Sequence, residues 1–233
     1  MTALFACLLL AAPSHARWTQ LLERFDHAGV VDYRGLKEHV PELDDYLRVL
    51  VTTRDLDQLP RDEKLAFYLN AYNAYTVKMV LDHYPLSSIR SIGLLPGAAF
   101  RTGFIPLGGE TLSLNDLEDR LRALRDPRIH FALVCASKSC PALRAQAYTA
   151  AQLDAQLDQA ARGFLADAGK NRLEGEAVWL SSIFKWYRGD FEGAAGSLPA
   201  FVARFAPRPM ADALGTPGAR IGFLDYDWSL NGR

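Results

Sequence analysis

One histidine and two cysteines fall within a short central segment, and their types could support thiol chemistry. The segment from His130 to Cys140 reads HFALVCASKSC. Its apolar first half, rich in aromatic and β-branched residues, predicts an inner strand that ends at Cys135, and the proline after Cys140 predicts that a helix begins there. The positive end of that helix, together with Lys138, would stabilise the Cys140 thiolate, which is the nucleophilic form of cysteine. We therefore expect Cys140 to act as a nucleophile and His130 as its base.

Two other interpretations of the same residues stay open. In an oxidising compartment, Cys135 and Cys140 would pair as a structural disulfide, with His130 hydrogen-bonded in the core. A metal site would use these three side chains, but their spacing matches no common zinc-finger pattern and only three soft ligands are in view. We therefore expect no metal and no cofactor.

Two asparagines lie on the most apolar helix that the sequence predicts. Residues 60–83 carry apolar side chains on nearly every side, which indicates a central, buried helix. Asn70 and Asn73 have the i, i+3 spacing that places them on one stripe of that helix. A buried amide must find hydrogen-bond partners or cost about 1–3 kcal/mol. The two amides therefore either brace a neighbouring backbone or line a polar site, where they would orient His130 or donate to an oxyanion.

The remaining pattern predicts many helices and few strands. Without a regular alternation of strand and helix, this favours an α+β fold in which helices, including the central buried one, pack around a small, mainly antiparallel sheet. Helices are expected over residues 18–27, 36–53, 60–83, 114–124, 153–164, 182–191 and 198–205, hairpins over 103–114 and 173–180, and single strands over 129–135 and 221–228.

The composition and the N-terminal residues limit the classes of protein to which this chain can belong. The chain has 233 residues, is about half apolar and has a formal net charge of −1, so it lacks the basic excess of a nucleic-acid binder. No apolar stretch reaches the roughly 18 residues of a transmembrane helix. Residues 1–16 end in Ser14-His15-Ala16 and fit a signal peptide. We expect residues 17–233 to form a single domain that is exported to the periplasm or secreted.

Five motifs together resemble the domain-of-unknown-function family 547. They are FYLNAYNA (67–74), IHFALVC (129–135), SCP (139–141), IFKWY with the following DF (183–191), and YDWSLN (226–231). The resemblance spans about residues 25–231 and implies no activity. It implies pattern positions at Asn70, Asn73, His130, Cys135, Cys140, Lys185, Trp186, Tyr187 and Asp227. Because both cysteines belong to the pattern, it fits a disulfide or a paired redox or metal role as well as catalysis.

The sequence thus predicts one of two functions. The first is a thiol-dependent hydrolase or acyltransferase acting on an amide or ester, in which Cys140 attacks, His130 moves the proton, and Asn70 or Asn73 orients the imidazole or donates to the oxyanion. The second is a binding module without chemistry. There a Cys135–Cys140 disulfide holds the loop, and Lys185, Tyr187 and Lys138 receive a ligand. In both cases the partner is a small molecule or a peptide, and no oligomeric state follows.

Overall fold

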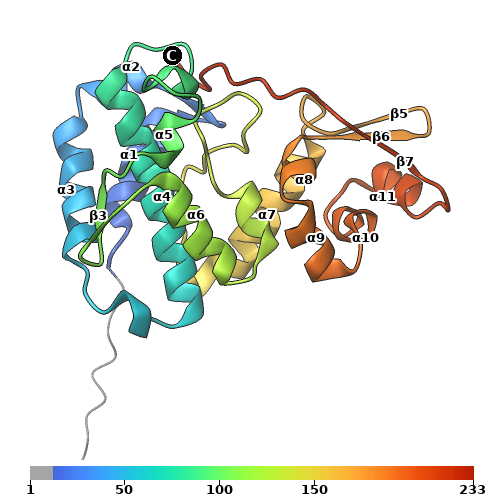
Figure 1. The fold of residues 1–233 in the computed structure, drawn as a ribbon, viewed down its shortest axis with the longest axis horizontal. Helices are drawn as coiled ribbons and strands as arrows, with labels where there is room; N and C mark the ends of the chain where they lie inside the picture. Colours follow the sequence, from blue (N-terminus) through green and yellow to red (C-terminus); the bar gives the residue numbers. More distant parts are fainter. Residues whose placement is uncertain (1–12) are drawn as a thin grey trace, which may run out of the picture.

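A long buried helix, α4 (Arg61–His83), organises the larger part of the molecule (Figure 1). Asp62 and Glu63 in its first turn complement the positive end of the helix dipole. The helix ends at His83, because the next residue, Tyr84, precedes Pro85, and a residue before proline disfavours the helical conformation. Its side chains from Leu65 onward are buried on nearly every side, so the prediction of a central helix is confirmed.

The computed structural model describes residues 13–233, and the predicted α+β class is confirmed within them. The predicted signal peptide falls mostly outside the described residues and stays a prediction. No helix of the described part is long and apolar enough to cross a membrane. In chain order, the elements around α4 are α1 (Ala16–Phe25), β1 (Asp26–His27), β2 (Val30–Val31), α2 (Tyr33–Lys37), α3 (Val40–Thr52), the 3-10 helices η1 (Leu56–Gln58) and η2 (Ile89–Ser91), α5 (Ala98–Arg101), β3 (Ile105–Leu107), β4 (Glu110–Leu112) and α6 (Leu114–Ala123).

The next elements lie between the two parts of the molecule: η3 (Pro127–Phe131), η4 (Ala150–Gln152) and α7 (Leu153–Ala166). A second, smaller part, on the right in Figure 1, consists of β5 (Arg172–Glu174), β6 (Ala177–Leu180), α8 (Ile183–Trp186), α9 (Arg188–Ala195), α10 (Leu198–Ala203), α11 (Arg208–Leu214) and β7 (Arg220–Phe223). The two predicted hairpins are confirmed as β3–β4 and β5–β6. In place of one sheet, the described strands form three small ones, and β7 pairs with β6 in parallel.

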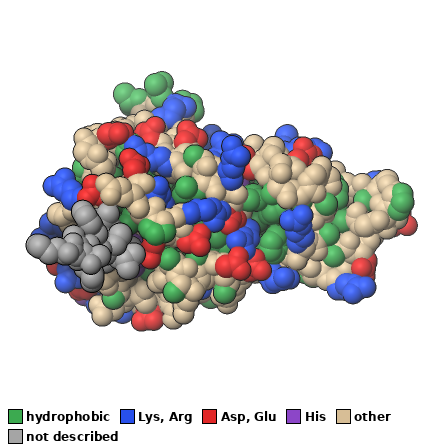
Figure 2. Space-filling view, turned by 90° about the horizontal axis from the view of Figure 1, so that it is seen from below, with side chains coloured by type: hydrophobic (Ala, Val, Ile, Leu, Met, Phe, Trp, Pro, Cys, Tyr) green, Lys and Arg blue, Asp and Glu red, His purple; other side chains and the backbone are tan. Residues whose placement is uncertain are grey.

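Each part has its own hydrophobic core, and η3 and α7 contribute side chains to both. Ile129 packs in the core around α4, whereas Phe131 packs among the aromatic side chains of the C-terminal part. His130 lies between them and is buried. Across the face seen in Figure 2, basic and acidic side chains are interspersed, as the near-neutral composition leads one to expect.

The predicted inner strand at residues 129–135 is wrong. Its first residues belong to the 3-10 helix η3, which Asp126 caps by accepting a hydrogen bond from the backbone N–H of Arg128. Residues 133–135 have no regular structure. A short apolar run is compatible with any buried backbone, and no strand among residues 13–233 pairs with it.

The chain ends in a segment that we call the C-terminal strap, residues 224–233. After β7 it leaves the C-terminal part and runs back to the larger part, as the red trace in Figure 1 shows. There the N–H of Asn231 donates to the carbonyl of Ala136 (3.1 Å), and the N–H of Lys138 donates to the carbonyl of Ser229 (2.9 Å). These two hydrogen bonds thus hold residues 136–138 against residues 229–231 of the strap.

Candidate functional site

The two central cysteines touch each other across a tight loop, residues 135–140, which we call the dithiol loop. Their Sγ atoms lie 2.7 Å apart, and both cysteines are free. The backbone N–H of Cys135 also donates to the Cys140 sulfur (2.8 Å). Ala136 has a positive φ of 57°, which reverses the chain directly after Cys135. The expected structural disulfide is therefore not formed, although the two thiols are in contact.

The two thiols differ in exposure and acidity. Cys135 is partly exposed, whereas Cys140 is buried. Burial disfavours the Cys135 thiolate, but hydrogen bonds from Cys140, Ser137 and Tyr226 outweigh it and lower the pKa of Cys135 to about 7. Burial first, and then the neighbouring Cys135 sulfur, raise the pKa of Cys140 well above its ordinary value. The accessible, more acidic thiol is thus Cys135 and not Cys140, the residue that the sequence suggested.

The predicted helix start at Cys140 is also wrong. The residues after it have no helical structure until η4 begins at Ala150, so the Cys140 sulfur does not lie in the first turn of a helix that would stabilise its thiolate. Lys138 is exposed and lies on the opposite side of the dithiol loop, where it lines a separate cavity. The acidity of the site comes instead from hydrogen bonds to Cys135, including one from Tyr226 at 3.3 Å.

We predict a pH profile for the reactivity of Cys135. Only the thiolate reacts, so the rate of alkylation should rise with pH and reach half of its plateau near pH 7. Tyr226→Phe removes one hydrogen-bond donor from the sulfur, so the midpoint should move upward, toward the roughly 8.5 of a free thiol. The measurement is the rate of iodoacetamide labelling against pH in a Cys7→Ser background, so that the third cysteine does not contribute.

Tyr187→Phe serves as the matched control for that titration. It removes a hydroxyl from the same cavity, and this hydroxyl is not among the groups that lower the pKa of Cys135. Its midpoint should therefore stay that of the wild type. Equal midpoints for Tyr226→Phe and Tyr187→Phe would contradict a role for the Tyr226 hydroxyl.

Asn70 and Asn73 brace backbone rather than the imidazole. The amide of Asn73 donates to the carbonyl of Ala132 (3.0 Å) and accepts from the N–H of Val134 (2.9 Å). Asn70 makes the same pair of bonds with the backbone of Tyr148, at 2.8 and 2.9 Å. The sequence left open whether these amides brace a neighbouring backbone or line a polar site. The structure shows that they brace backbone, because they hold the segments before and after the dithiol loop against α4.

His130 is hydrogen-bonded away from the cysteines. Its Nε2 lies 2.8 Å from the carboxylate of Asp190, which Arg122 holds with two further hydrogen bonds of 2.8 and 3.0 Å. The ring stacks on Tyr187 with centroids 3.9 Å apart. Burial lowers the pKa of His130 to about 4 although Asp190 opposes this, so the imidazole is neutral at neutral pH. Among the described residues no hydrogen bond joins His130 to either cysteine, so the expected thiol–imidazole pair is not formed.

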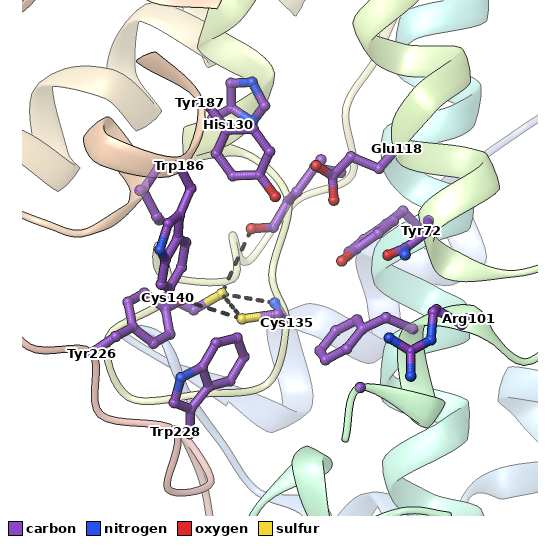
Figure 3. Close-up of a pocket in the computed structure, with 15 residues that line it drawn as sticks. Tyr72, Arg101, Glu118, His130, Cys135, Cys140, Trp186, Tyr187, Tyr226 and Trp228 are labelled. Carbon is purple, nitrogen blue, oxygen red and sulfur yellow. Dashed lines mark hydrogen bonds between the residues drawn. The ribbon is translucent and has the colours of Figure 1, made fainter. Parts of the chain in front are cut away.

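The dithiol loop opens into a cavity of about 290 Å³ (Figure 3). One side is an aromatic wall, which we define as Trp186, Tyr226 and Trp228; their ring centroids lie 4.6–5.9 Å apart. Figure 3 shows Tyr72, Arg101 and Glu118 on the side opposite this wall, with the two sulfurs between them. The lining is completed by Gly97, Phe100, Asn115, His130, Leu133, Cys135, Cys140, Ile183 and Tyr187.

Glu118 is a carboxyl group in this cavity that the sequence did not single out. It lies on α6, and burial raises its pKa while a hydrogen bond to Tyr187 works in the opposite direction. Nothing in its spacing distinguishes it from the exposed acids of the same helix. Arg101, on α5, escaped notice for the same reason, whereas Tyr226 belongs to the YDWSLN motif.

The ligand residues predicted for a binding module are dispersed. Tyr187 lines the cavity, but Lys185 is exposed and outside its lining. Lys138 lines the separate cavity of about 600 Å³. Cys140 lines both this cavity and the one beside the dithiol loop. No group of three or more His, Cys, Asp or Glu side chains that could hold a metal ion occurs in residues 13–233. His130, Cys135 and Cys140 are not gathered into such a group, and His130 bonds to Asp190 instead.

Comparison with known proteins gives a family match for part of the chain but no activity. Residues 56–165 match the family described as "Protein of unknown function, DUF547", and this span includes the two asparagines, His130 and the dithiol loop. The motifs in α8 and in the C-terminal strap lie beyond the matched residues. No curated protein and no solved structure matches the chain. The resemblance to the DUF547 family that the motifs predicted is thus confirmed for residues 56–165, which carry most of the candidate site.

Proposed function

We propose that this protein carries out thiol–disulfide exchange, with Cys135 as the attacking thiol and Cys140 as the resolving thiol. The observation that supports this is the 2.7 Å contact between a partly exposed cysteine of lowered pKa and a buried cysteine of raised pKa. A thiol with a pKa near the ambient pH is the best attacker, because it is largely thiolate and still strongly nucleophilic. Cys140, which is buried and has a raised pKa, stays protonated until the second step.

In the first step, the Cys135 thiolate attacks one sulfur of a substrate disulfide. A bond forms between Cys135 Sγ and that sulfur, the substrate S–S bond breaks, and the other half leaves as a thiolate. The hydrogen bonds to Cys135 from Ser137 (3.2 Å) and Tyr226 (3.3 Å) stabilise the thiolate before attack. The product is a mixed disulfide at the mouth of the cavity.

In the second step, Cys140 attacks Cys135 Sγ and releases the bound half of the substrate. Cys140 must first lose its proton, and Glu118 is the one carboxylate among the described residues that line the cavity. Its raised pKa suits a group that accepts this proton and returns it to the departing thiolate. The net result is oxidation of the two cysteines to a disulfide and reduction of the substrate disulfide to two thiols.

The proposal is tested by treating the reduced protein with hydroxyethyl disulfide. Mass spectrometry should show the loss of two hydrogens and a Cys135–Cys140 disulfide, with the release of two equivalents of mercaptoethanol. The control is the urea-unfolded protein, which lacks the contact between the sulfurs and should react more slowly at pH 7. A folded protein whose cysteines remain reduced while the unfolded chain reacts would overturn the proposal.

A second candidate function uses the same residues but changes the reaction to acyl transfer from an amide or ester. Glu118 favours it, since a carboxyl of raised pKa facing the same cavity as a thiolate could protonate a leaving group. The nucleophile would then be Cys135, and Cys140 would not be consumed. A nitrophenyl ester separates the candidates: acylation of Cys135 that persists in Cys140→Ser and turns over supports acyl transfer, and a protein that is not acylated excludes it.

A further inference from the structure

The cavity beside the dithiol loop has the size and surface of a small-molecule site. Its volume of about 290 Å³ lies near the lower end of the range that holds small ligands. Trp186 in the aromatic wall is 48% exposed, which is unusual for so large an apolar side chain. Its ring is held at a fixed angle by stacking on Trp228, at 5.9 Å between centroids. A flat apolar group entering the cavity would therefore meet a preformed stacking surface.

A cation without an acidic partner faces the aromatic wall. Arg101 lines the cavity and donates to the carbonyl of Pro96 (2.5 Å), but it forms no ion pair with any carboxylate of residues 13–233. Arg122, by contrast, is neutralised by Asp190. In Figure 3, Arg101 and Glu118 lie at different ends of the cavity, with Tyr72 between them. The end near Arg101 therefore carries an unbalanced positive charge, which suits a carboxylate.

We propose that the substrate is a small disulfide that carries a flat apolar or aromatic group next to its sulfur, and a carboxylate. The ring stacks on the aromatic wall at Trp186, the carboxylate binds Arg101, and the sulfur thereby comes to Cys135. This inference rests on the proposed thiol–disulfide exchange and names its substrate class.

Four model disulfides test the ring and the carboxylate separately. Dithiobis(nitrobenzoate) has both groups, dithiodipyridine has only the ring, dithiodipropionate has only the carboxylate, and hydroxyethyl disulfide has neither. Each second-order rate constant with the reduced protein is divided by that of N-acetylcysteine thiolate with the same compound, which removes intrinsic differences in reactivity. The variants are Arg101→Gln, Trp186→Leu and, as a matched control, Arg208→Gln, because Arg208 is an exposed arginine on α11.

The compound with both groups should give the largest normalised rate. Arg101→Gln should lower the rates of the two carboxylate compounds about tenfold more than those of the two neutral ones, because a charge-assisted hydrogen bond is worth about 1.5–3 kcal/mol and 1.4 kcal/mol corresponds to a factor of ten. Trp186→Leu should act selectively on the two ring compounds, and Arg208→Gln on none.

Two outcomes overturn the inference and are distinguishable. If all four compounds close the Cys135–Cys140 disulfide with equal normalised rates, or if Arg101→Gln affects all four equally, exchange stands and the substrate class is wrong. If none closes the disulfide, the proposed exchange itself fails, and the inference with it.

Discussion

Replacing Cys140 by serine should stop the reaction with a disulfide at the mixed disulfide on Cys135. Without the resolving thiol, no group attacks Cys135 Sγ, so the protein should retain one half of hydroxyethyl disulfide as a stable adduct. Replacing Cys135 instead should lower the rate at pH 7 by about a hundredfold or more, because the remaining thiol is buried, and burial is the largest cause that raises the pKa of Cys140. Mass spectrometry of the adduct and the rate of thiol consumption measure the two effects.

The experiment is done in a Cys7→Ser background, so that Cys135→Ser and Cys140→Ser each carry a single cysteine. Ser139→Ala is the matched control, since it changes the same loop without touching either sulfur; its hydroxyl accepts from the N–H of Asp227 (2.9 Å). It should behave as the parent. If Cys135→Ser reacts as fast as Cys140→Ser, the assignment of the attacking thiol is wrong.

Replacing Asn73 by leucine should lower the free energy of unfolding by about 2–5 kcal/mol. The side chain of Asn73 is 3% exposed, and its loss leaves the carbonyl of Ala132 and the N–H of Val134 without their partner. Each buried backbone group left unpaired costs about 1–3 kcal/mol, and leucine supplies apolar contact but no hydrogen bond. The measurement is urea unfolding at neutral pH.

Asn115→Ala provides the comparison for Asn73→Leu. Asn115 is exposed, so its replacement should change the free energy of unfolding by less than about 0.5 kcal/mol. Because Asn73 fixes the backbone just before Cys135, the folded fraction of Asn73→Leu should also show a raised thiol pKa. A variant as stable as Asn115→Ala would contradict the bracing role.

The sequence was sufficient for the elements whose pattern is local. The central helix follows from an apolar run with acids at its start and a proline after its end, and the β3–β4 hairpin follows from its Gly108-Gly109 turn. Hydrophobic periodicity could not distinguish residues 129–135 from a strand, because the backbone of this run forms its hydrogen bonds with a side chain and not with a neighbouring strand. The amide of Asn73 provides the donor and the acceptor that a neighbouring strand would provide. The sequence raised the bracing role of Asn73 as one possibility but could not say which backbone it holds.

The chemistry of the cysteines depended on contacts between distant parts of the chain. Cys-Pro predicted a helix start, but residues 141–149 have no helical structure, and Asn70 bonds to the backbone of Tyr148 in this segment. The acidity of Cys135 comes in part from Tyr226, which no local pattern connects to it. Both cysteines were identified from the sequence, but their roles were exchanged, because exposure and hydrogen bonding decide them and spacing does not.

The C-terminal strap has a consequence for the order in which the site can form. Tyr226 lies 91 positions after Cys135 in the sequence, and residues 136–138 are bonded to Ser229 and Asn231 of the strap. A folding intermediate in which the strap has not yet docked therefore carries both thiols without the hydroxyl of Tyr226 and the indole of Trp228 that complete their surroundings. The lowered pKa of Cys135 is thus a property of the assembled tertiary structure, and the sulfur pair acquires it only when the strap docks.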